Sequence, residues 1–73
     1  MQIKAKEAFS AIRIKKGFSI TGLAHKMGVN PSVVSSIEKG NNIRPETAKK
    51  AYTALATNFD DIFCIQNEEE IHL

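Results

Sequence analysis

The 73-residue sequence has a single cysteine, no tryptophan and no apolar run long enough to cross a membrane. Cys64 has no second cysteine with which to form an internal disulfide, which suits a reducing cytoplasm. The N-terminus carries charged residues and lacks the apolar core of a signal peptide. We therefore expect one small cytoplasmic domain with a modest core and no contact with a membrane.

Sequence signatures of enzymes are also lacking, because there is no P-loop, no dinucleotide fingerprint and no CxxC motif. His25, His72 and Cys64 stand at scattered positions that do not match the ligand spacing of a zinc site. Asp60 and Asp61 are adjacent carboxylates, but they fall in the first turn of a short predicted helix, where acidic residues favour the helix dipole. We expect no catalytic residue, no metal and no cofactor.

Basic residues are absent after Lys50, although the net charge of the whole chain is only +2. Residues 1–50 carry a net charge of +7, and residues 51–73 carry −5. This asymmetry is typical of a surface that faces a polyanion, with an acidic segment kept away from it. A solvated surface with an acidic tail would give the same totals, so charge alone does not decide the function.

The stretch 20–39 predicts two short helices separated by a tight break. Apolar residues recur at helical spacing on both sides of the break, at Leu23, Ala24, Met27, Val34 and Ile37. Gly28 suits the left-handed conformation that ends a helix, and Asn30 followed by Pro31 suits the start of the next. A connection this short makes the two helices cross steeply, as in a helix-turn-helix.

The other predicted elements are helical as well. A first helix covers about residues 4–16, with frayed chain or a short strand before it, a fourth begins at Pro45, and a short fifth is capped by Asn58. The predicted fold class is all-α, a compact five-helix bundle that contains the helix-turn-helix. We assign this domain to residues 1–63 and an acidic C-terminal tail to residues 64–73.

These residues resemble the phage repressor and Cro-like helix-turn-helix family over about residues 5–63. The matching residues are Leu23-Ala24, Gly28-Val29, Val34 and Ile37-Glu38-Lys39-Gly40 in the centre, with Phe9, Ile12, Arg13 and Lys16-Gly17-Phe18-Ser19 before them and Arg44-Pro45, Leu55 and Phe59-Asp60-Asp61-Ile62-Phe63 after them. The resemblance implies a sequence-specific transcriptional regulator, of the kind that phages and mobile elements carry, which binds double-stranded DNA. Its third helix would lie in the major groove.

The resemblance also implies a role for particular residues. Those expected to reach base edges are Asn30, Pro31, Ser32, Val33 and Ser36, of which Val33 would meet a thymine methyl group. Those expected to contact phosphates are Ser19, Lys26, Lys39, Asn41, Asn42 and Arg44. Arg13 and Glu38 match a partly buried ion pair of the family, so we expect both to be structural.

A second function is consistent with the departures from the family pattern. Ile20 replaces a common glutamine, and the reading helix contains neither Gln nor Arg. Exposed apolar groups at Ile20, Pro31 and Val33 would suit a protein interface. The alternative is therefore an antirepressor or antitoxin-like module that docks on another repressor or a toxin.

A homodimer is expected, because a monomer reads only one short half-site and such folds usually pair by two-fold symmetry. The residues expected at the dimer interface are Phe59, Ile62, Phe63 and Ile65, since they supply more apolar surface than the end of so short a chain needs to cover itself.

Overall fold

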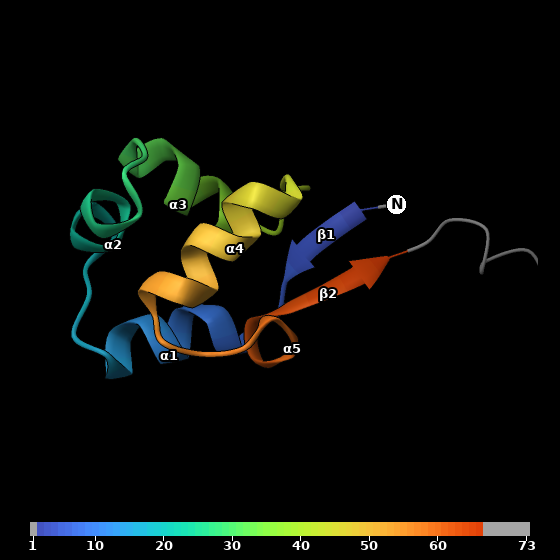
Figure 1. The fold of residues 1–73 in the computed structure, drawn as a ribbon, viewed down its shortest axis with the longest axis horizontal. Helices are drawn as coiled ribbons and strands as arrows, with labels where there is room; N and C mark the ends of the chain where they lie inside the picture. The colour runs from blue at the N-terminus through green and yellow to red at the C-terminus, as the bar shows by residue number, and fades with distance from the viewer. Residues whose placement is uncertain (1, 67–73) are drawn as a thin grey trace, which may run out of the picture.

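The computed structural model describes residues 2–66. Helices make up most of this part of the chain, and two short strands lie side by side at one end (Figure 1). In chain order the elements are β1 (Gln2–Ala5), α1 (Ala8–Lys15), α2 (Ile20–Met27), α3 (Pro31–Glu38), α4 (Pro45–Ala54), α5 (Phe59–Ile62) and β2 (Phe63–Gln66). Seven residues of the predicted acidic tail, 67–73, lie outside the described residues.

The predicted break between α2 and α3 is confirmed. Ser19 caps α2, where its Oγ accepts a hydrogen bond of 2.9 Å from the backbone N–H of Gly22. Gly28 ends the helix in the left-handed conformation, with φ of 74°. Asn30 then takes an extended conformation, and Pro31 is the first residue of α3. The start and end of both helices thus follow from residues at the break itself.

The prediction of a purely helical fold is wrong at both ends of the domain, although the alternative of a short strand before the first helix is confirmed. Residues 2–5 form β1, which pairs antiparallel with β2 so that Ile3 lies opposite Ile65 and Ala5 lies opposite Phe63. The first helix begins only at Ala8, because residues 2–5 are held extended in the sheet, and the backbone N–H of Lys6 continues this contact by donating to the carbonyl of Ile62 (2.8 Å). Residues 64–66, assigned to the tail, belong to this sheet.

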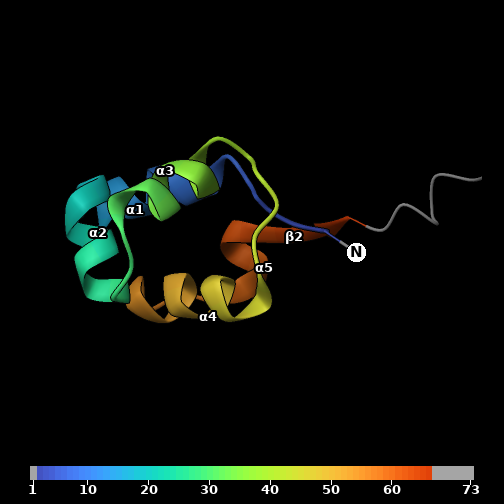
Figure 2. The same ribbon diagram turned by 90° about the horizontal axis from the view of Figure 1, so that it is seen from above.

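A third segment joins β1 on the edge away from β2. The backbone N–H of Ile43 donates to the carbonyl of Ile3 (3.0 Å), and the side-chain Oδ1 of Asn42 accepts from the N–H of Ile3 (2.9 Å). The loop between α3 and α4 is therefore fastened to the N-terminal strand, as the close approach of the loop and β1 in Figure 2 illustrates.

The core lies between the helices and the inner face of the sheet. Its largest fully buried side chains are Phe9, Phe63, Leu23, Ile37, Leu55, Ile62 and Val34. Phe63 packs between Phe9 and Phe59, with ring centroids 5.8 and 5.5 Å away.

The core corrects the predicted dimer interface. Ile62 and Phe63 are 0% and 1% exposed within a single chain, so they are not available to a second copy. Phe59 is partly buried against the same core, and only Ile65, at 56% exposure, projects into solvent. Most of the apolar residues in this segment therefore serve to fill the core of a single chain.

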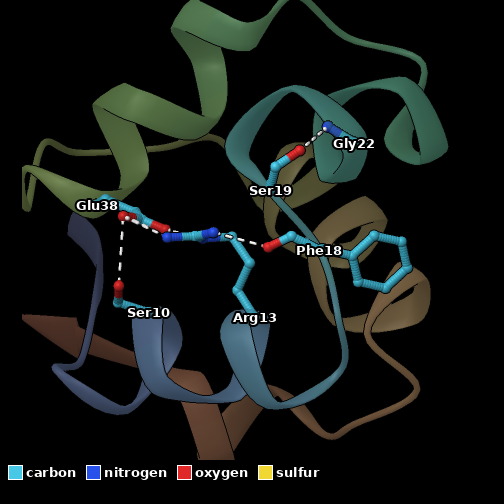
Figure 3. Close-up of polar contacts among 6 residues, drawn as sticks. All are labelled: Ser10, Arg13, Phe18, Ser19, Gly22 and Glu38. Carbon is cyan, nitrogen blue, oxygen red and sulfur yellow. Dashed lines mark hydrogen bonds and ion pairs between the residues drawn. The ribbon is translucent and has the colours of Figure 1, made fainter.

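The predicted ion pair between Arg13 and Glu38 is present and connects α1 with the end of α3 (Figure 3). The Nε of Arg13 donates to one carboxylate oxygen of Glu38, and Nη2 lies 3.4 Å from the other. Nη1 donates to the carbonyl of Phe18 (2.7 Å), and the Oγ of Ser10 lies 3.4 Å from the same carboxylate. With the two charged side chains only 11% and 18% exposed, the cluster is shielded from water on most sides.

Asp61 has the predicted structural role at the start of α5. Its Oδ2 accepts hydrogen bonds from the Thr57 hydroxyl (2.8 Å) and from the backbone N–H of Asn58 (3.2 Å). These two bonds favour the ionised carboxylate and lower the pKa of Asp61 below its ordinary value. Adjacent Asp60 is exposed on the same turn, and its backbone carbonyl accepts from the Lys6 ammonium (2.6 Å).

Replacing Arg13 by Met tests the contribution of the ion pair. The single variant leaves the Glu38 carboxylate shielded and unpaired, so we expect a loss of about 3 kcal/mol in the free energy of unfolding. A double variant, Arg13→Met with Glu38→Met, removes both charges and should be more stable than the single variant. Chemical denaturation measures both values, and a single variant as stable as the wild type would contradict the structural role.

Ala56 offers a test of backbone strain. It follows α4 with φ of 52°, a left-handed conformation that costs an L-residue about 1–2 kcal/mol. Ala56→Gly should remove this cost, partly offset by the greater freedom of glycine in the unfolded chain, for a net gain of about 0.5–1 kcal/mol. Gly28→Ala is the matched control, because a Cβ there meets no atom within 4 Å and the φ of 74° alone should destabilise the variant. Thermal unfolding would contradict the argument if both variants shifted the midpoint in the same direction.

Candidate nucleic-acid interface

Helix α3 has one buried side and one accessible side. Val34 and Ile37 are fully buried, and they face the core. Of the five residues predicted to read bases, Asn30, Pro31 and Ser32 are exposed, and Val33 and Ser36 are partly buried. Figure 1 places α3 along one margin of the molecule, with α1 and α5 at the opposite margin. The predicted reading residues therefore lie on an accessible face of the fold.

A shallow hollow of about 360 Å³ lies between α3, the following loop and the start of α4. Its lining residues are Ser32, Val33, Ser36, Asn42, Ile43, Arg44 and Thr47. Three of these were predicted to read bases and two to contact phosphates. The hollow therefore brings residues of both predicted classes onto one surface, and we call it the reading hollow.

The two asparagines of the loop make hydrogen bonds within the chain. The Nδ2 of Asn41 donates to the Oγ of Ser36 (2.9 Å), which ties the loop back to α3. Asn42 uses its Oδ1 to accept from the backbone N–H of Ile3, as described above. Both residues were predicted to contact phosphates, and the structure gives each of them a positioning role in addition.

Lys39 and Arg44 are exposed at the two ends of this loop. Lys39 follows the last residue of α3, and Arg44 precedes Pro45, the first residue of α4. Arg44 contributes to the lining of the reading hollow, whereas Lys39 does not. Both basic residues predicted to contact phosphates from this loop are therefore accessible on the surface.

The other two residues predicted to contact phosphates, Ser19 and Lys26, lie at opposite ends of α2. Ser19 is exposed at the N-terminus of α2, where the helix dipole and free backbone N–H groups favour an anion. Lys26 lies near the other end of α2, with its ammonium 5.6 Å from the centroid of the Phe18 ring. Lys26 lines a separate hollow of about 470 Å³ with Lys49 and Lys50 of α4. The structure thus does not bring Lys26 together with the reading hollow.

Asn30 begins α3 through its backbone conformation alone. Its φ and ψ of −71° and 148° are those of an N-cap residue, but its side chain makes no capping hydrogen bond. The exposed amide consequently keeps donors and an acceptor for a base edge.

The sequence interpretation missed the contribution of Ile3, Ile43 and Thr47 to this surface. Ile3 and Ile43 hold the loop through backbone hydrogen bonds, and Ile43 and Thr47 line the hollow. The alternation of polar and apolar residues in Gln2-Ile3-Lys4-Ala5 was the available signal for a strand at the N-terminus.

Between residues 2 and 66, no group of three or more His, Cys, Asp and Glu side chains lies close enough to hold a metal ion. Nor does any helix in this range have the length and apolar character needed to span a bilayer.

The comparisons with known proteins identify one family. A model described as "Helix-turn-helix" matches residues 10–62, from within α1 to the end of α5. The match includes both helices at the break, the reading hollow and both residues of the ion pair. No curated protein matches the chain.

Asn42→Ala tests how the loop is positioned. The substitution removes the acceptor of the partly buried Ile3 N–H, so we expect a loss of about 1–2 kcal/mol in stability and faster hydrogen exchange at Ile3. Asn42→Asp retains an acceptor oxygen and should preserve slow exchange at that amide. Asn41→Ala is the matched control, since Asn41 bonds to Ser36 and not to β1. Equal exchange at Ile3 in the wild type and in Asn42→Ala would show that the bond does not hold the loop.

Proposed function

The chain belongs to the helix-turn-helix family, of the Cro-like type that its sequence resembles, and we propose that it regulates transcription by sequence-specific binding of double-stranded DNA through α3. The observation that carries the proposal is the reading hollow, where side chains of α3 and the cation of Arg44 line one accessible surface. A duplex whose major groove received α3 would place its backbone against the flanking loop.

The small side chains on α3 suit close approach to a groove. Ser32 and Ser36 are short, so the helix axis can come near the base edges before any side chain collides with them. Lys39 and Arg44 would neutralise phosphates on one flank, and the N-terminus of α2 at Ser19 would receive a phosphate on the other. Affinity would come mainly from the phosphates, and selectivity from the few groups on α3.

Burial favours DNA over the alternative protein partner. Ile20 and Val33, the apolar groups proposed to contact another repressor or a toxin, both pack in part against the core. Only Pro31 of the three, at the start of α3, is exposed, and none of them is a Trp, Tyr or Arg, the side chains that most often carry the energy of a protein interface.

We propose that the protein binds its operator as a homodimer in the cytoplasm, because one α3 reads too few base pairs for useful selectivity. Ile65 of β2 is the predicted interface residue with the greatest exposure, and Phe59 retains a partly open surface. Sedimentation with and without DNA gives the stoichiometry.

Substituting Lys39 and Arg44 tests the proposed function. Each phosphate contact contributes about 0.9 to the slope of log affinity against log salt concentration. We therefore expect the double variant Lys39→Ala, Arg44→Ala to weaken binding to all sequences and to reduce this slope by about 2. Binding is measured by fluorescence anisotropy on duplexes from the region that flanks the gene, over a series of salt concentrations.

A control for the loss of one positive charge comes from the far side of the fold, and it is compared with the single variants Lys39→Ala and Arg44→Ala. Lys16 is exposed and follows α1, which lies at the margin opposite α3 in Figure 1. The single variant Lys16→Ala should leave the slope of log affinity against log salt concentration unchanged. Absence of binding to any duplex at low salt, combined with tight binding to a neighbouring repressor or toxin, would replace the proposed function by the alternative.

A further inference from the structure

We infer that the reading hollow selects thymine, using Val33 for the methyl group and the hydroxyl of Ser36 for the O4 atom. The inference rests on the proposed binding of DNA through α3, and adds to it the identity of a base. Its evidence is the position of these two side chains one turn apart on the wall of one hollow.

The hydrogen bond from Asn41 prepares Ser36 to donate. A serine hydroxyl has one hydrogen to donate and an oxygen that accepts. In the structure the Nδ2 of Asn41 donates to this oxygen at 2.9 Å, which occupies one of its two lone pairs. Because linked hydrogen bonds polarise one another, this bond makes the hydroxyl a stronger donor toward a further acceptor. In the major groove the O4 of thymine is an acceptor, whereas the corresponding group of cytosine is an amino donor.

Val33 would supply the apolar contact for the thymine methyl group. It is partly buried against the core, so its position is fixed, and its remaining surface lines the hollow. Ile43, in the loop that leads from α3 to α4, contributes to another part of the wall. A methyl group between these side chains would leave water, and thymine is the ordinary DNA base that presents one in the major groove.

The rest of the hollow does not offer the usual means of reading guanine. No residue from Pro31 to Ser36 is an Arg or Lys, the side chains that bind guanine in bidentate fashion. Arg44 lies on the loop side, where its predicted partner is a phosphate. A hydroxyl donor beside an apolar group therefore matches thymine better than it matches the other three bases.

The test begins with duplexes selected from a random library by the wild-type protein at moderate salt. In the selected sequence, each thymine is replaced in turn by deoxyuridine, which removes only the methyl group. At one thymine of each half-site we expect affinity to fall about fourfold, the value of one buried methyl group. Val33→Ala should bind the thymine and deoxyuridine duplexes equally at that position.

The second arm tests the hydroxyl. Replacing the same thymine and its partner adenine by 5-methylcytosine and guanine keeps the methyl group and exchanges the O4 acceptor for an amino donor. The wild type should discriminate against this duplex, and Ser36→Ala should discriminate less. Ser35→Ala is the matched control, since Ser35 does not line the hollow and should retain the wild-type ratio. Thermal unfolding confirms that all three variants are folded.

The outcomes separate this inference from the function on which it rests. Salt-dependent binding without any position sensitive to deoxyuridine would overturn the reading of thymine and leave DNA binding intact. Equal discrimination by the wild type and Ser36→Ala would overturn the role of the hydroxyl. Failure to select any duplex, even at low salt, would overturn the proposed function and this inference together.

Discussion

The Arg13–Glu38 cluster is the interaction on which the geometry of the interface depends. One guanidinium contacts the carboxylate at the end of α3 and the carbonyl of Phe18 at the entry to α2. It thereby fixes, from α1, both helices that would contact DNA. Glu38 is also the last residue of α3, so the same bond sets the point from which the loop with Lys39 departs. If the two shielded charges moved apart, each would be poorly solvated, so the pair favours one arrangement of the helices that carry it. It therefore holds α1 and α3 at a fixed separation.

A second constraint holds the loop from its far end. β1 lies between β2 and Ile43, so backbone hydrogen bonds run from the C-terminal strand through the N-terminal strand to the loop beside α3. Arg44 follows directly, and the loop can present its cation only where Ile43 is held. The sheet is short, yet it positions a loop of the candidate interface as well as closing one end of the core around Ile3 and Phe63.

The contrast between the predicted and missed features follows from the range of the interactions involved. Ser19, Gly28, Asn30 and Pro31 act on their own neighbours, so the bounds of α2 and α3 were predictable from the residues themselves. A short strand before the first helix could be foreseen as an alternative, but its pairing could not, because β1 and β2 come from distant parts of the chain and each has only four residues. The same holds for Asn42, whose partner Ile3 is 39 positions away. Ile62 and Phe63 were correctly seen as apolar, but a sequence does not distinguish the inside of one chain from the interface between two.

The uneven burial of the α3 face has a consequence for how such a protein changes its target over generations. Ser32 is exposed and free of the core, so replacing it alters recognition at little cost to folding. Val33 packs against the core and lines the reading hollow, so a change there affects both properties at once. Under the proposed binding mode, changes in operator preference would arise first at Ser32, whereas a base contacted by Val33 would change only together with the packing of the core.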